Sequence, residues 1–229
     1  MDEKKMKIGL IHATMNSVQP ILEAFHKHAP YVTLVNFMDE SLIYDLNAIG
    51  SVTKEMSRRL VAMASKAEGS GVDGILLTCS SFTPVVADIS HLFEVPILSA
   101  DISMLEKAIE MGDRIGIIAT VPAAGPTTAT LLKEMAEKCH KLIEIETAVI
   151  PEAFEALQNG KQELHDAFIH QKAEELSIHC DVIVFAQFSM ARAFETLDVK
   201  TKPILTSPEI SVKAIIAEIK KREGIMAEY

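Results

Sequence analysis

Short apolar runs rich in β-branched residues alternate along the chain with longer stretches whose apolar residues recur at helical spacing. Gly, Pro and Asp bound the short runs, and this alternation is typical of βαβ units with parallel strands. The pattern predicts strands over residues 7–12, 31–36, 74–78, 96–98, 114–119, 142–149, 182–185 and 203–205. It predicts helices between them, most clearly over residues 52–69, 102–111, 127–140, 161–178 and 211–222.

Segments of the first half of the chain recur in the second half at a nearly constant offset. Ile8-Gly9-Leu10-Ile11 matches the sequence at 115–118, and Pro96-Ile97-Leu98 matches that at 203–205, both at an offset of 107 residues. The run at 73–81 aligns with that at 181–189 at an offset of 108. We therefore expect an α/β fold of two pseudo-symmetric, Rossmann-like lobes, each with a mainly parallel four-stranded sheet flanked by helices. The expected lobes are residues 1–98, against which a C-terminal helix over 207–229 packs, and residues 99–206.

Composition and charge narrow the class of protein. Of the 229 residues, 48% are hydrophobic and 24% charged, as in ordinary folded domains. The net charge of −10 repels phosphate backbones, which argues against a nucleic-acid partner. No apolar run reaches the length of about 18 residues that a membrane span needs, so no membrane partner is expected. Three cysteines make no disulfide framework, and a cytoplasmic location is expected.

Loops rich in hydroxyls and amides follow four of the predicted strands. Ligands of open parallel sheets bind beyond the carboxyl ends of the strands, so we expect these loops to face one cleft between the lobes. Backbone N–H groups at the helix starts would favour an anion there, and the absence of a glycine-rich phosphate motif favours a small carboxylate. Taken singly, each hydroxyl also fits a helix cap. The candidate substrate-binding residues are Thr14, Asn16, Thr78, Ser80, Ser81, Thr120, Thr127, Gln187, Phe188 and Ser189.

Cys79 and His12 are the candidate catalytic residues. Cys79 follows a buried strand and precedes a helix expected to begin at Pro84 with Thr83 as its cap, a location that favours a thiolate. It could act as a nucleophile or proton carrier, or be an inert packing cysteine. His12 closes the first strand, where it could deprotonate or orient Cys79, or be a satisfied strand-end histidine. Cys180 precedes its strand, about 20 Å from the carboxyl end, and reads as a packing cysteine.

Metal ligation is not expected from the sequence. Paired histidines and cysteine–histidine neighbours occur, but they lack the spacing of a three- or four-ligand zinc site. The carboxylates on the predicted helices read as a solvated face.

The duplicated chain, with Thr78-Cys79-Ser80-Ser81-Phe82 after the third strand and residues 120–128 after the fifth, resembles the aspartate/glutamate/hydantoin racemase superfamily. The likeness spans nearly the whole chain. It implies a cofactor-independent enzyme, with maleate isomerases and arylmalonate decarboxylases as related branches, in which two cysteines exchange the proton next to a carboxylate. It places the first cysteine at Cys79 and the groups that hold the carboxylate at Ser80, Ser81, Thr120 and Thr127. A homodimer is the expectation at the level of the family. In the glutamate racemases of this superfamily an aspartate stands at the position of His12.

The sequence departs from this pattern at the second cysteine, because the position 108 residues after Cys79 holds Gln187. An amide can donate hydrogen bonds to a developing enolate but cannot carry a proton at physiological pH. We therefore expect a racemase or isomerase that acts on a small acid or amino acid through Cys79, with His12, a water molecule or another group as the second acid or base. The alternatives are a one-cysteine decarboxylase or lyase of the arylmalonate type, and a protein that binds a small carboxylate without turnover.

Overall fold

The chain forms two compact units in the computed structural model, which describes residues 5–198, 201–222 and 224. Unit 1 comprises Met1–Ala100 and Pro208–Tyr229, and unit 2 comprises Asp101–Ser207. Parts of the expected lobes lie outside the described residues: 1–4 and 199–200, and, in the expected C-terminal helix, 223 and 225–229.

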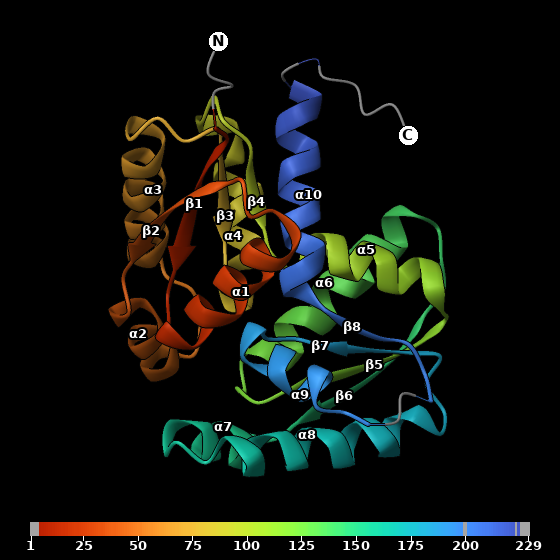
Figure 1. The fold of residues 1–229 in the computed structure, drawn as a ribbon. Helices are drawn as coiled ribbons and strands as arrows, with labels where there is room; N and C mark the ends of the chain where they lie inside the picture. The colour runs from red at the N-terminus through yellow and green to blue at the C-terminus, as the bar shows by residue number, and fades with distance from the viewer. Residues whose placement is uncertain (1–4, 199–200, 223, 225–229) are drawn as a thin grey trace. The chain divides into compact units, whose positions relative to one another are not determined.

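Unit 1 is built on a parallel sheet with the strand order β2-β1-β3-β4 (Figure 1). Its strands are β1 (Lys7–His12), β2 (Thr33–Met38), β3 (Gly74–Leu77) and β4 (Ile97–Ser99). Its α-helices are α1 (Val18–His28), α2 (Ser41–Ile49), α3 (Lys54–Gly69), α4 (Thr83–Ile89) and α10 (Ser207–Arg222). Short 3-10 turns are η1 (Met15–Ser17), η2 (Ser80–Phe82) and η3 (Ser90–Leu92).

Unit 2 repeats this topology, with a parallel sheet in the order β6-β5-β7-β8. Its strands are β5 (Arg114–Ala119), β6 (Glu144–Val149), β7 (Val182–Phe185) and β8 (Ile204–Thr206). Its helices are α5 (Ile102–Met111), α6 (Ala124–Lys138), α7 (Pro151–Gln158), α8 (Gln162–Ser177), the turn η4 (Phe188–Met190) and α9 (Ala191–Glu195). The equivalent strands β1 and β5, β3 and β7, and β4 and β8 contain the segments that match at the offset of 107 or 108 residues.

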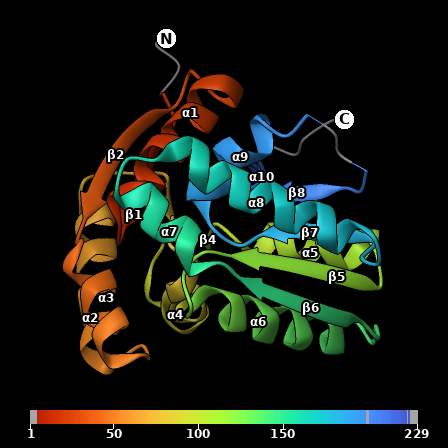
Figure 2. The ribbon, with the colours of Figure 1, turned by 90° about the horizontal axis from the view of Figure 1, so that it is seen from below.

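Glycines in the strands let helices pack closely on the sheets. A Cβ atom on Gly74 of β3 would lie 2.8 Å from Cδ1 of Ile219, so the glycine makes room for α10. In unit 2 a Cβ atom on Gly116 of β5 would lie 3.2 Å from Cδ1 of Leu176 in α8. Figure 2 shows α8 on one side of the unit 2 sheet and α6 on the other. The central strands β1, β3, β5 and β7 are almost entirely buried, as is typical of parallel sheets covered by helices.

The predicted fold class is confirmed: the structure is α/β, with two four-stranded parallel sheets flanked by helices. The strands β1, β5 and β7 have the predicted bounds. β2 begins and ends two residues later than predicted, and it is an edge strand with no fully buried residue. Its bounds follow its register with β1, where Lys7 pairs with Thr33 and His12 with Met38. No helix in the described part of the chain combines the length and the apolar character that crossing a membrane would require.

Candidate active site

His12 lies at the centre of a hydrogen-bonded cluster at the carboxyl end of the unit 1 sheet. Its side chain is fully buried, and its Nδ1 atom lies 2.8 Å from Oγ1 of Thr78 and 3.3 Å from Oγ of Ser17. Its Nε2 atom lies 2.9 Å from Oδ1 of Asn36, within β2. Both ring nitrogens therefore have a hydrogen-bond partner, and the tautomer decides which of them donates.

The environment of His12 keeps the imidazole neutral. Burial lowers the pKa of His12, and the hydrogen bond to Asn36 offsets only part of that effect. The hydroxyl of Thr78 lies 3.0 Å from that of Ser17 and 3.2 Å from the carbonyl oxygen of Ile11, so the cluster is also tied to the main chain of β1. A neutral, fully hydrogen-bonded imidazole is suited to fixing the residues around it.

Cys79 comes directly after Thr78, two residues beyond the end of β3. Its backbone is extended (φ −125°, ψ 111°), and its carbonyl oxygen accepts a hydrogen bond of 3.1 Å from the N–H of Phe82 as η2 begins. The residue is 7% exposed and belongs to the apolar cluster of unit 1, along with Phe82 and Val85. The fold thus places the thiol between the end of β3 and the turn η2. Its neighbour in the sequence, Thr78, belongs to the His12 cluster.

The turn after Cys79 differs from the prediction in its cap. α4 begins at Thr83, and Phe82 occupies the cap position without a side-chain hydrogen bond, so the predicted cap at Thr83 is wrong. The hydroxyl of Thr83 instead lies 2.5 Å from that of Ser99 at the end of β4.

Ser80 is half-buried and Ser81 is buried, both within η2. Two candidate binding residues of the first loop, Thr14 and Asn16, are half-buried, and the Thr14 hydroxyl accepts a bond of 3.3 Å from the N–H of Asn16.

In unit 2 the position equivalent to Cys79 is Gln187, two residues beyond the end of β7. Its Oε1 atom accepts hydrogen bonds from the backbone N–H of Thr120 (2.5 Å), from the Thr120 hydroxyl (3.1 Å) and from the N–H of Val121 (3.2 Å). Thr120 is fully buried. The amide oxygen therefore binds both donors of Thr120, a residue that the family resemblance assigns to the substrate carboxylate.

The other candidate residues of unit 2, Thr127, Phe188 and Ser189, differ in burial and in hydrogen bonding. The hydroxyl of Thr127 donates to the carbonyl oxygen of Ala123 at 2.7 Å, within the first turn of α6. Phe188 is buried and Ser189 is half-buried in η4. Thr120 and Gln187 are therefore brought together, whereas the Thr127 hydroxyl is bonded to its own helix.

The structure adds two residues to the unit 1 cluster that the sequence analysis did not select. Ser17 and Asn36 both contact the imidazole of His12. Asn36 is a polar residue near the carboxyl end of a strand, which is a usable signal. Ser17 lies in the loop that follows β1, but nothing in the sequence distinguishes its hydroxyl from those of its neighbours.

Comparison with known proteins covers almost the entire chain. The family model described as Asp/Glu/Hydantoin racemase matches residues 8–222. A search of curated proteins finds no match. Solved structures with the same fold include a glutamate racemase isoform from Bacillus anthracis, with 14% identity, 99% of this chain and 85% of that chain covered, and a TM-score of 0.71.

Two further structures have a similar fold. An aspartate racemase homologue from Pyrococcus horikoshii has 18% identity, a TM-score of 0.67, and coverage of 93% of this chain and 99% of that chain. An allantoin racemase from Klebsiella pneumoniae has 14% identity, a TM-score of 0.64, and coverage of 97% and 90%. At these identities the structural likeness concerns the fold.

Proposed function

Because the chain belongs to the Asp/Glu/Hydantoin racemase family, we propose that it is a cofactor-independent racemase or isomerase in which the Cys79 thiol moves a proton. Membership of the family supports a racemase- or isomerase-type enzyme. The proton moves at the carbon next to a carboxylate of a small acid or amino acid. Solved structures of this fold include racemases of glutamate and aspartate, whose α-carbon carries a carboxylate, and of allantoin, whose stereogenic carbon lies next to a ring carbonyl instead. These are the first compounds to test.

The observation that carries the proposal is the position of Cys79. The thiol follows β3 at the carboxyl end of a parallel sheet, where ligands of such folds bind, and it begins a turn that contains Ser80 and Ser81. Backbone N–H groups and hydroxyls at such a turn can stabilise a carboxylate whose negative charge grows in the reaction. A thiolate at this point can take a proton from the neighbouring carbon.

In this mechanism the bond between hydrogen and the α-carbon breaks as the S–H bond of Cys79 forms. The electron pair of the broken bond moves into the carboxylate, which gives a planar enediolate. A water molecule on the other face supplies the proton that inverts the centre and leaves as hydroxide, which the Cys79 thiol neutralises, whereas return of the proton from Cys79 to the same face restores the substrate. We assign His12 a positioning role, because its neutral ring holds Thr78, the residue before Cys79, through the Oγ1 contact of 2.8 Å.

Gln187 favours a second candidate, a decarboxylase or lyase with a single proton carrier. Its amide stands at the position in unit 2 that corresponds to Cys79, and its oxygen is bound by three donors of Thr120 and Val121. In a decarboxylation the bond to the leaving carboxylate breaks, carbon dioxide departs, and the electron pair remains as an enediolate. The Cys79 thiol then supplies the proton, and no second acid or base is needed.

The proposal is tested by incubating the protein in deuterated water with each enantiomer of aspartate, glutamate and allantoin, and with hydantoins, maleate and substituted malonates. A racemase incorporates deuterium at the α-carbon of recovered substrate and forms the other enantiomer. A decarboxylase releases carbon dioxide and incorporates one deuterium in the product. An isomerase converts maleate to fumarate. Binding of one of the carboxylates without exchange, isomerisation or release of carbon dioxide would show a carboxylate-binding protein and would contradict both enzyme proposals.

A further inference from the structure

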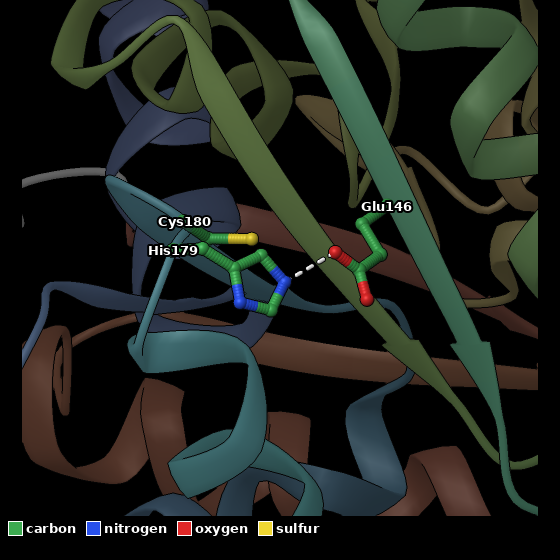
Figure 3. Close-up of side chains that lie close together, drawn as sticks. All are labelled: Glu146, His179 and Cys180. Atoms are coloured by element: carbon green, nitrogen blue, oxygen red, sulfur yellow. Dashed lines mark hydrogen bonds and ion pairs between the residues drawn. The ribbon is translucent and has the colours of Figure 1, made fainter.

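Three side chains of unit 2 that the proposed function does not use lie close together on the sheet. The side-chain ligand atoms of Glu146, His179 and Cys180 all lie within 4.8 Å of one another. Figure 3 shows the His179 ring directed at the Glu146 carboxylate, with the sulfur of Cys180 alongside the ring. Glu146 and His179 form a hydrogen-bonded ion pair when the ring is protonated.

The backbone explains why these three side chains meet. Glu146 is in the edge strand β6, and its register partner on β5 is Gly116. The position that a Cβ atom on Gly116 would occupy lies 3.1 Å from Sγ of Cys180. Side chains of paired residues in a parallel sheet are on the same face. The missing side chain of Gly116 therefore leaves the space in which the thiol lies next to Glu146.

The turn after α8 fixes the other two ligands. The N–H groups of His179 and Cys180 both donate to the carbonyl oxygen of Leu176, at 3.2 Å and 2.9 Å. The N–H of the next residue, Asp181, donates to the carbonyl oxygen of Arg114 at 2.7 Å, which ties the turn to the start of β5. Two consecutive side chains are in this way held over the same face of the sheet.

We propose that Glu146, His179 and Cys180 form a binding site for a transition-metal ion of the zinc class. One carboxylate oxygen, one imidazole nitrogen and one thiolate sulfur suit such an ion, whereas Mg²⁺ and Ca²⁺ prefer oxygen ligands alone. Bond lengths of about 2.0–2.3 Å in a tetrahedral site put ligand atoms about 3.3–3.7 Å from one another. The three ligand atoms already lie within 4.8 Å of one another, so side-chain movements of about an ångström bring them to the spacing of a tetrahedral site.

Exposure determines which ligands move. The side chains of His179 and Glu146 are 49% and 53% exposed, so they can rotate to admit an ion between Nε2 and the carboxylate. Cys180 is 2% exposed, so its thiol stays in place while the two exposed ligands rotate. The ion binds the neutral imidazole of His179 and takes the place of the thiol proton of Cys180, which is released. A fourth position is left for water.

The site would join the edge strand β6 to the connection between α8 and β7. Glu146 and His179 are separated by 33 positions in the sequence, which is why a search for zinc-like spacing does not reveal the group. A bound ion would hold the strand and the turn together, so we infer a structural role at the end of the sheet opposite the carboxyl ends of its strands.

The test uses the reduced full-length protein and Co²⁺, which gives a near-ultraviolet charge-transfer band when a thiolate binds it. We expect one Co²⁺ per chain with this band, displaced by Zn²⁺. Cys180→Ser should abolish the band, while the matched controls Cys139→Ser and Cys79→Ser should keep it. Cys139 is the informative control because it is exposed and precedes His140, a second cysteine–histidine pair.

Two variants of the exposed ligands keep the test decisive if Cys180→Ser fails to fold. Glu146→Gln and His179→Gln alter half-exposed side chains, and each should raise the dissociation constant for Zn²⁺ by more than about tenfold. No charge-transfer band in the wild type, a band that survives in Cys180→Ser, a band lost in Cys139→Ser, or unchanged dissociation constants in the two exposed variants would overturn the proposal. All of these readouts are independent of catalysis at Cys79.

Discussion

The contacts of Gln187 predict how strongly one amide stabilises the loop after β5. Its Oε1 atom accepts from two backbone N–H groups and one hydroxyl, at 2.5, 3.2 and 3.1 Å, and the donor Thr120 is fully buried. Gln187→Ala removes the acceptor and leaves these donors unpaired. An unpaired buried donor costs about 1–3 kcal/mol. Because Gln187 is half-buried and water can enter the space, we expect a loss of about 2–3 kcal/mol in the free energy of unfolding.

Urea unfolding followed by far-ultraviolet circular dichroism measures this loss, since the chain contains no tryptophan. Gln187→Glu keeps an acceptor oxygen at the position of Oε1 and should retain the wild-type free energy of unfolding at neutral pH, because charged acceptors form stronger hydrogen bonds. Gln171→Ala is the matched control: that exposed amide donates to the Glu175 carboxylate one turn along α8, and the expected change is within about 0.5 kcal/mol. If Gln187→Ala were as stable as Gln171→Ala, the reasoning would be refuted.

Three further predictions concern unit 1 and the pH dependence of folding. Burial lowers the folded-state pKa of His12 and of His165, so the unfolded state takes up protons first as the pH falls. The free energy of unfolding should therefore be highest above about pH 6.5 and decrease at lower pH, and His12→Gln should reduce the slope of this free energy against pH between pH 7 and 5. Gly74→Ala should cost about 1–3 kcal/mol in urea unfolding by forcing α10 off the sheet, whereas Gly69→Ala, with open space at its Cβ position, should cost nothing; equal stabilities would argue against the packing account. Thr78→Val keeps the shape but removes the hydroxyl bonded to His12, and it should cost about 1–3 kcal/mol, a loss that an unchanged urea midpoint would contradict.

The buried strands could be predicted from the sequence almost to the residue. Strands β1, β5 and β7 are apolar runs buried on both faces and bounded by charged or small residues, so the local pattern alone marks their ends. The edge strand β2 was placed two residues too early, because its half-exposed residues carry no such pattern and its register depends on pairing with β1. Edge position is a property of the assembled sheet.

The chemistry of the site could be predicted only in part. The position of Cys79 after β3 follows from the strand pattern, and the contact of Thr120 with Gln187 joins two residues that the sequence analysis selected. The partners of His12 could not be derived, because Asn36 and Thr78 reach the ring from 24 and 66 residues away. Hydrogen bonds between side chains that are distant in sequence depend on strand order and register, which the sequence does not state.

The most direct test of the account is deuterium exchange at the α-carbon of an identified substrate, measured by NMR for the wild type, Cys79→Ser and Cys139→Ser. Cys139 is exposed at the end of α6 and serves as the matched cysteine control. We predict that Cys79→Ser loses exchange while it still binds the substrate, and that Cys139→Ser exchanges at the wild-type rate. Exchange at the wild-type rate in Cys79→Ser would contradict the central role of this thiol.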